Sequence, residues 1–260
     1  CSGVTTNFQN PTGSPLTVNV DPTFQSTTAS GAIFAVNSGG FATDVKIAGN
    51  VTTTTLSTYG IQIRNDGSSN VLKVSQTAGS ITTGGTSLIV ENRAHGTTDV
   101  TTAGDNISKF ANGVAITNEK LSSDLIFTQT AGTITGGTNG INSLNDGTGS
   151  TNITVAGVVT GGTGVGINTS DSDTISSTTD NFATVTLNSG AVVSSTSGIA
   201  IQNDEGDSLT TVNDGATIQG KVISGDGNDN LVINGTANIS GATLLDGGDK
   251  ANSVDLLGST

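Results

Sequence analysis

The chain has few of the residues that stabilise most small extracellular folds. It contains one cysteine, no tryptophan, no methionine and three prolines, and aromatic residues make up 3% of its 260 residues. One cysteine excludes an internal disulfide, and no cluster of metal ligands is obvious. The fold must therefore rely on its packed core, and the shortage of aromatic residues suits a narrow core of aliphatic side chains.

Basic residues are also scarce. Lys and Arg together number 8 against 21 Asp and Glu, which gives a net charge of −13 and a pI near 4.1. This balance argues against nucleic acids, heparin-like polyanions and anionic membrane surfaces as partners. No apolar run approaches the roughly 18 residues that span a bilayer, so we expect no direct membrane insertion. An Asp excess with abundant Thr, Ser, Asn and Gly is usual for solvated extracellular repeats.

The beginning of the sequence carries no recognisable secretion signal, so we expect a mature form or a fragment. Cys1 fits three roles: the residue left by signal cleavage, the acylated cysteine of a bacterial lipoprotein, or half of a disulfide with a partner outside this chain. The sequence leaves these three open.

A short phrase with two alternating apolar residues returns about every 26 residues, and a fixed period of this length is typical of solenoids. Strong copies occupy residues 60–65, 87–92, 113–118 and 198–203, and weaker ones occupy 33–37, 140–145 and 164–169. The first apolar residues, which we take as equivalent, are Ile33, Ile61, Leu88, Val114, Ile141, Val165 and Ile199. We expect Ile61, Leu88 and Val114 to stack in one core column.

The repeat predicts strands. Its two-residue alternation is that of a strand with one buried face, and no segment shows the apolar stripe of a helix. A second phrase at residues 76–86 returns at 129–138 and 156–163, so a unit holds about three short strands. The sequence therefore predicts an all-β parallel β-helix of roughly 8–10 coils, forming one elongated domain. We expect a cap or lead-in at 1–30, the solenoid proper at 31–235 and terminal coils at 236–260.

An asparagine closes many copies of the repeat. Asn tolerates the positive φ of tight turns, and stacked amides can bond to one another. We therefore predict structural turn positions with positive φ for Asn37, Asn65, Asn92, Asn118, Asn145 and Asn203. The three prolines, Pro11, Pro15 and Pro22, suit the N-terminal cap because proline cannot donate to a strand ladder.

Two segments interrupt the period. Residues 169–180 add about eight residues to one unit and predict a polar loop, whose Asp171, Asp173 and Asp180 are candidate ligand-binding residues. Residues 93–112 also look irregular and contain the only histidine, His95.

The last forty residues change character. Residues Gly225 to Leu231 and Leu245 to Leu256 resemble the Asp/Gly-rich coils that end the passenger region of bacterial autotransporters (type V secretion). This resemblance implies a right-handed β-helix displayed outside the cell and anchored in the outer membrane through a barrel domain of the full-length protein. It also implies adhesion, self-association or biofilm formation, with a host surface protein, a glycan or another copy of the chain as partner.

Residues 224–232 also approximate one calcium-binding nonapeptide, in which Asp226, Asn228 and Asp229 would be ligands. Such repeats share ions between consecutive coils, and the second copy, at Gly248, has Lys250 where glycine is needed. A plain Asp/Gly turn is therefore the favoured alternative, and no other cofactor is expected.

Signs of catalysis are few. His95 has no nucleophile motif beside it, and we expect a solvated loop histidine. Asp171/Asp173 and Asp204/Asp207 could form the acid/base pairs of a polysaccharide hydrolase, but both arginines, Arg64 and Arg93, lie elsewhere in the coil register. Ice binding through threonines at 52–55, 82–83 and 101–102 is disfavoured because they do not repeat at one coil position. We therefore expect a non-enzymatic adhesin, with a glycan hydrolase as the alternative.

Overall fold

The computed structural model describes residues 6–10, 15–28, 31–53, 58–67, 71–170, 182–242 and 245–258. These ranges form 27 strands and contain no helix, so none of them provides a helix long and apolar enough to cross a membrane. All strand pairs are parallel, and the chain coils into a β-solenoid of about eight turns. The predicted parallel β-helix is therefore confirmed.

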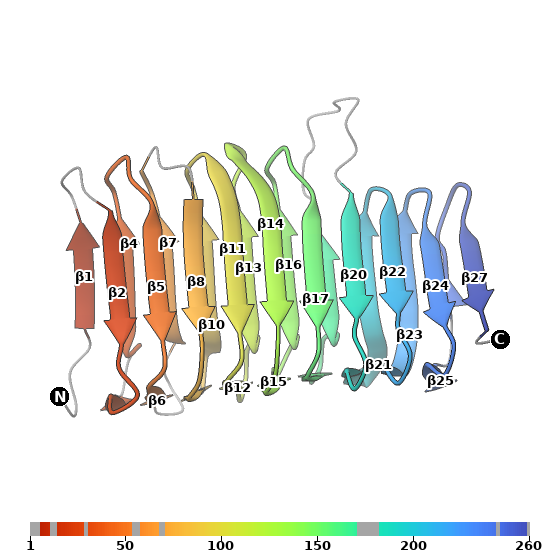
Figure 1. Cartoon of the computed structure of the whole chain (residues 1–260), viewed down its shortest axis with the longest axis horizontal. Coiled ribbons are helices and arrows are strands. Elements are labelled where there is room, and N and C mark those ends of the chain that lie inside the picture. Colours follow the sequence, from red (N-terminus) through yellow and green to blue (C-terminus); the bar gives the residue numbers. More distant parts are fainter. Residues whose placement is uncertain are drawn as a thin grey trace.

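Each turn contributes a strand to three faces, which we name front, lower and rear from their positions in Figure 1. The front face is a ten-stranded sheet in chain order. Its strands are β2 (Leu16–Val20), β5 (Thr43–Ile47), β8 (Val71–Gln76), β11 (Gly96–Thr102), β14 (Ser122–Gln129), β17 (Thr151–Val155), β20 (Ala183–Leu187), β22 (Ser208–Val212), β24 (Asn230–Asn234) and β27 (Ser253–Leu257).

The lower and rear faces merge into one 17-stranded sheet because two long strands, β21 (Val192–Glu205) and β23 (Thr217–Asp226), continue across the corner between them. The lower face also holds β3 (Gln25–Thr28), β6 (Asn50–Thr53), β9 (Ser80–Thr83), β12 (Asp105–Ser108), β15 (Thr133–Thr135), β18 (Val158–Gly161) and β25 (Asn238–Gly241). The rear face also holds β1 (Thr6–Asn10), β4 (Ile33–Asn37), β7 (Tyr59–Asn65), β10 (Thr86–Asn92), β13 (Val114–Asn118), β16 (Ile141–Asn145), β19 (Ile167–Ser170) and β26 (Leu245–Asp246).

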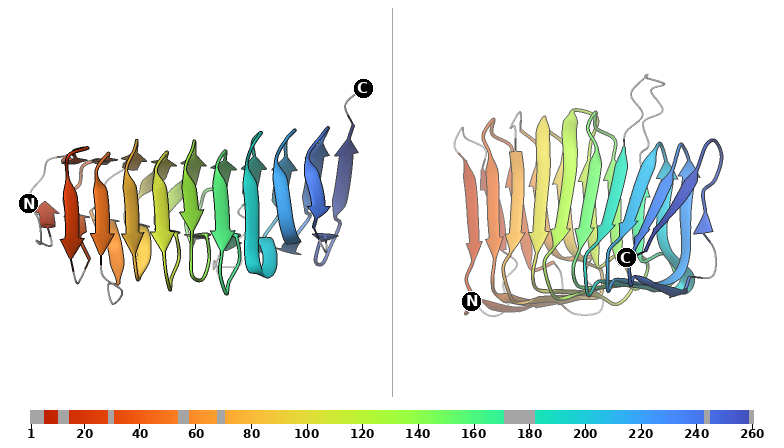
Figure 2. Two further views of the ribbon diagram at one scale, coloured as in Figure 1. Left: turned by 90° about the horizontal axis from the view of Figure 1, so that it is seen from below. Right: turned by 45° about the vertical axis from the view of Figure 1, so that its right-hand side comes forward.

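The coil is right-handed. In Figure 1 the front strands run downward and the rear strands run upward while the chain advances from left to right. Figure 2 shows the elongated stack from below, with the two termini at opposite ends.

Aliphatic columns fill the space between the three faces. On the rear face Leu88 pairs with Ile61 on one side and with Val114 on the other, and all three side chains are fully buried. The predicted column is therefore confirmed. Burial of each such side chain contributes about 1.5–3 kcal/mol, so a core without tryptophan accumulates stability turn by turn.

The predicted register slips in two copies of the repeat. Ile141 pairs with Ile167, not Val165, and Ile167 pairs with Ile201, not Ile199. A shift of two residues keeps the same side chains facing inward, so the alternation could not exclude it. The 34-residue step persists, now between Ile167 and Ile201.

The predicted backbone of the closing asparagines is wrong. Among the described residues, Lys250 is the one non-glycine residue with positive φ. Five asparagines instead end rear-face strands with fully or almost fully buried side chains: Asn37, Asn65, Asn92, Asn118 and Asn145. Asn203 lies in a different column, because it pairs with Thr169.

The buried asparagine amides form hydrogen bonds with backbone groups at the corner between the rear and front faces. Asn92 Oδ1 accepts hydrogen bonds from Asn65 Nδ2 at 3.1 Å and from the Ala94 N–H at 3.2 Å. Its Nδ2 donates to the Gly96 carbonyl at 3.2 Å. The predicted amide-to-amide bond is thus confirmed at this pair, and the asparagine satisfies a sharp turn from inside the core.

Side-chain oxygens also connect successive turns. An Asp or Asn Oδ1 accepts the backbone N–H of a residue 21 to 30 positions later, at 2.6–2.9 Å. These turn-to-turn bonds join Asn50 to Ser80, Asp105 to Thr133, Asp124 to Ser150, Asn139 to Val165, Asp207 to Asn228 and Asp214 to Thr236. Each turn therefore supplies acceptors for the next one.

Strand pairing extends into both predicted end regions. Strands β1, β2 and β3 pair with β4, β5 and β6, so the stack includes residues before position 31. At the other end β27 pairs with β24, but its inward-facing Val254 and Leu256 are 52% and 70% exposed. Residues 93–112, predicted to be irregular, contain the regular strands β11 and β12.

Candidate functional site

The sequence-predicted ligand-binding residues Asp171, Asp173 and Asp180 lie outside the described residues. The described chain stops at the end of β19 on the rear face and resumes just before β20 on the front face.

The three candidate calcium ligands have different surroundings. Asp226 is exposed, and its backbone pairs with that of Asp249 in the next turn. Asn228 is also exposed, and its Nδ2 donates to Asp207 at 3.1 Å. Asp229 is buried, and its Oδ1 accepts from the Ser208 hydroxyl at 2.7 Å. Within the described ranges, no three Asp, Glu, His or Cys side chains form a group that could hold a metal ion.

The residues considered for catalysis are also separate. His95 is an exposed bend residue. Asp204 accepts a hydrogen bond from Gln202, whereas Asp207 accepts from Asn228 of the next turn. Neither arginine contacts these two aspartates, because both form ion pairs on the rear face with other carboxylates.

The front face carries a column of threonines. Consecutive strands β11, β14, β17, β20 and β22 pair Thr101, Thr128, Thr154, Thr186 and Thr211 in one register. All five alternate with buried neighbours and are half-buried at the surface. The lower face aligns Thr52 with Thr82 in the same way. The expectation that the threonines at 52–55, 82–83 and 101–102 do not share a coil position is therefore wrong for Thr52 and Thr82, whereas Thr101 lies on a different face.

The threonine column forms a regular polar surface. Strand spacing sets the repeat along it at about 4.8 Å. In the part of the chain that the structure describes, none of the five hydroxyl groups makes a hydrogen bond to the protein. Beside the column on β20 and β22, the outward positions Thr184 and Leu209 are uncharged. A flat array of hydroxyl and methyl groups is thus available to a ligand.

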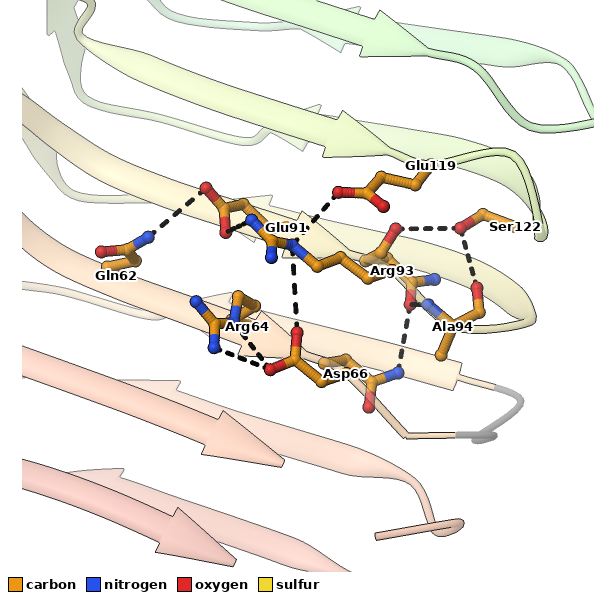
Figure 3. Close-up of polar contacts among 10 residues, drawn as sticks. Gln62, Arg64, Asp66, Glu91, Arg93, Ala94, Glu119 and Ser122 are labelled. Atoms are coloured by element: carbon orange, nitrogen blue, oxygen red, sulfur yellow. Dashed lines mark hydrogen bonds and ion pairs between the residues drawn. The ribbon is translucent and has the colours of Figure 1, made fainter. Parts of the chain in front are cut away.

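A charged cluster lies at the rear face and its adjoining corner, over β7, β10 and β13 (Figure 3). Arg93 Nε lies 3.1 Å from Glu119 Oε1 and 3.9 Å from Asp66 Oδ1, so three consecutive turns are joined by one guanidinium. Arg93 Nη2 also contacts Glu91 Oε2 at 3.3 Å. Arg64 Nη2 lies 2.7 Å from Asp66 Oδ2. The cluster is held in place by contacts among its own members.

Aromatic rings adjoin the cluster. The Phe34 and Tyr59 ring centroids are 6.3 Å apart with a 43° angle between the planes. Arg64 Cζ lies 5.6 Å from the Phe34 centroid, within the range of a cation–π contact. Gly31 makes room for Tyr59, because a Cβ there would lie 2.0 Å from the ring. Burial raises the pKa of the Tyr59 hydroxyl.

A cavity of about 110 Å³ lies near the end of the stack. Its lining includes Val222, Leu231 and Asp229. Desolvation by burial raises the pKa of Asp229, and its Oδ2 has no hydrogen-bond partner among the described residues. That oxygen is itself inaccessible, so Asp229 does not offer it to a ligand in the cavity.

The charged cluster was not predicted from the sequence, although the positions of its residues within the repeat indicate that they are neighbours. Arg64 and Glu91 occupy the same place in two copies, and Asp66, Arg93 and Glu119 each follow the closing asparagine. Aligning outward positions as carefully as inward ones would have predicted these contacts.

Comparison of the chain with protein-family models, with curated proteins and with solved structures gives no match.

Proposed function

We propose that this chain is an adhesive module, displayed on or secreted from a bacterial cell, that binds a host surface or another copy of itself through the front face. The observation that carries the proposal is the column of five threonines with hydroxyl groups free of protein partners. The acidic composition of the chain and the resemblance of its last coils to autotransporter passengers also support it.

The mechanism is multivalent. Each threonine offers one hydroxyl group and one methyl group, so a single contact is weak. Contacts repeated at about 4.8 Å along a rigid sheet act together once the first has formed. Many copies on one cell or one particle multiply the effect again, so we expect strong attachment of particles despite weak binding by single molecules.

The test compares outward threonines of two faces, on beads coated with the full chain. One variant replaces Thr128, Thr154 and Thr186 of the front face by lysine, and its control replaces Thr82, Thr135 and Thr160 of the lower face. Attachment to a panel of host glycans and proteins, and to beads carrying the same chain, is measured. We expect front-face substitution to lower attachment about tenfold or more, because the contributions multiply.

Equal attachment by the two triple variants would remove the front face from consideration. Reducing-end release from polysaccharides is measured in parallel. Turnover by the unmodified chain would instead support the glycan hydrolase alternative.

A further inference from the structure

The single tyrosine and both arginines of the protein lie together on the rear face, opposite the threonine column. The chain has one tyrosine and two arginines, and Tyr59, Arg64 and Arg93 lie on or directly after the adjacent strands β7 and β10. With Phe34, Gln62 and Glu91 they form what we call the rear patch. Trp, Tyr and Arg are enriched among the residues that dominate binding energy at protein interfaces, so this clustering is a candidate recognition surface.

The aromatic part of the patch is fixed in place. Tyr59 lies where Gly31 leaves space, and Phe34 lies between Tyr59 and Arg64. Both rings are half-buried, so each is held by its surroundings and still reaches the surface. Rings in this state offer an apolar face to a ligand without the entropy loss of ordering a mobile side chain.

The polar part consists of planar groups that are already oriented. Gln62 Nε2 lies 3.4 Å from Glu91 Oε1, and Glu91 Oε2 lies 3.3 Å from Arg93 Nη2 (Figure 3). An amide, a carboxylate and a guanidinium therefore follow one another across β7 and β10. Together they present both donors and acceptors.

The two arginines in and around the patch are both paired with carboxylates, and the three carboxylates Asp66, Glu91 and Glu119 leave a single net negative charge. Arg64 and Arg93 both contact Asp66, and Arg93 also contacts Glu91 and Glu119. An anionic ligand would have to compete with these carboxylates in a protein of net charge −13. A cationic ligand would have to displace the guanidinium groups. The electrostatics therefore favour an uncharged ligand rich in hydroxyl groups.

We propose that the rear patch binds a neutral glycan. One sugar unit packs its C–H face against the Tyr59 and Phe34 side chains, and hydroxyl groups of the glycan exchange hydrogen bonds with Gln62, Glu91 and Arg93. A sugar ring has an apolar C–H face and a rim of hydroxyl groups that donate and accept, which matches the two parts of the patch. This inference deepens the proposed adhesive function by naming a ligand class, and it assigns that ligand to a surface other than the threonine column.

The experiment uses the full chain on an array of neutral oligosaccharides that carries sialylated and sulfated glycans for comparison. Two variants alter the patch: Tyr59→Leu removes a ring, and Gln62→Leu removes the amide. Gln202→Leu is the matched control, because Gln202 lies in the same outward column as Gln62, five turns further on. Melting curves are recorded for all variants to confirm that they fold.

We expect binding to at least one neutral glycan, weakened about tenfold or more by each patch variant and unchanged in Gln202→Leu. Binding confined to anionic glycans would overturn the proposal, as would neutral-glycan binding that both folded patch variants retain. If no glycan binds while coated beads still attach through the front face, this inference fails and the adhesive function stands. If the unmodified chain neither binds a glycan nor attaches to beads, both the glycan inference and the proposed adhesive function fail.

Discussion

The buried asparagine column makes a prediction that can be worked out from its contacts. Replacing Asn92 by leucine keeps the size of the side chain but removes an amide that is fully buried. Asn65 Nδ2 and the Ala94 N–H would lose their acceptor, and the Gly96 carbonyl would lose a donor. A buried polar group without a partner costs about 1–3 kcal/mol.

Three such losses sum to about 3–9 kcal/mol, and the apolar leucine offsets about 1.5–3 kcal/mol of this. We therefore expect the free energy of unfolding to fall by about 1.5–6 kcal/mol, a substantial part of the 5–15 kcal/mol typical of folded proteins. The control is Asn152→Leu, at an outward position of β17, where the amide makes no hydrogen bond within the described ranges. That change should cost less than about 0.5 kcal/mol.

Urea unfolding followed by circular dichroism gives both values, and amide hydrogen exchange locates the effect. Because solenoid turns contact only their neighbours, the loss of protection should be greatest in β7, β10 and β13. Equal midpoints for Asn92→Leu and Asn152→Leu would refute the idea that the amides hold the corner.

Three further predictions concern the core, the end cavity and a close contact between turns. Val114→Asp should lower the free energy of unfolding by several kcal/mol, whereas Ala115→Asp, one residue away on the outer face, should cost little; similar melting temperatures would contradict the register. Burial raises the pKa of Asp229, so its contribution to stability is full below the unfolded-state pKa near 3.8 and is lost as pH rises through the folded-state pKa. The melting temperature of Asp229→Asn should therefore rise relative to that of the unmodified chain between pH 3 and pH 7. A difference in melting temperature that stays constant with pH would contradict this. Gly137→Ala would place a Cβ 2.2 Å from the Lys109 carbonyl oxygen, so we expect a clear drop in melting temperature, and an unchanged value would show that the turns can separate there.

The sequence was sufficient for the architecture because the same physical constraint acts in every turn. Inward residues such as Ile61, Leu88 and Val114 are buried and apolar in each copy. The apolar alternation therefore recurs in too many copies to be a coincidence, and it identifies the repeat. The register at Val165 could not be decided in this way, because a shift by two residues leaves the same face buried. Pairing geometry, which the sequence does not contain, settled it on Ile167.

The asparagines show a different limit. Asn is common both in turns with positive φ and as a buried amide inside a corner, and composition does not separate these two uses. Residues 65 and 92 belong to the second kind because their side chains bond to each other across turns. The rear patch was missed for a related reason: outward positions differ from copy to copy, so Arg64 and Glu91 do not look like a repeat.

The turn-to-turn bonds from Asp and Asn oxygens have a consequence for how such a chain can change in length. Asp105 finds its N–H partner at Thr133 and Asn139 finds its partner at Val165, each one circuit later. Removing two residues from a strand would put the acceptors of the preceding turn out of step with the donors one circuit later, whereas removing a whole circuit would restore the match with the next turn. Duplication or loss of complete turns is therefore the tolerated way for this protein to become longer or shorter, and its reach from a surface can vary only in steps of about 4.8 Å.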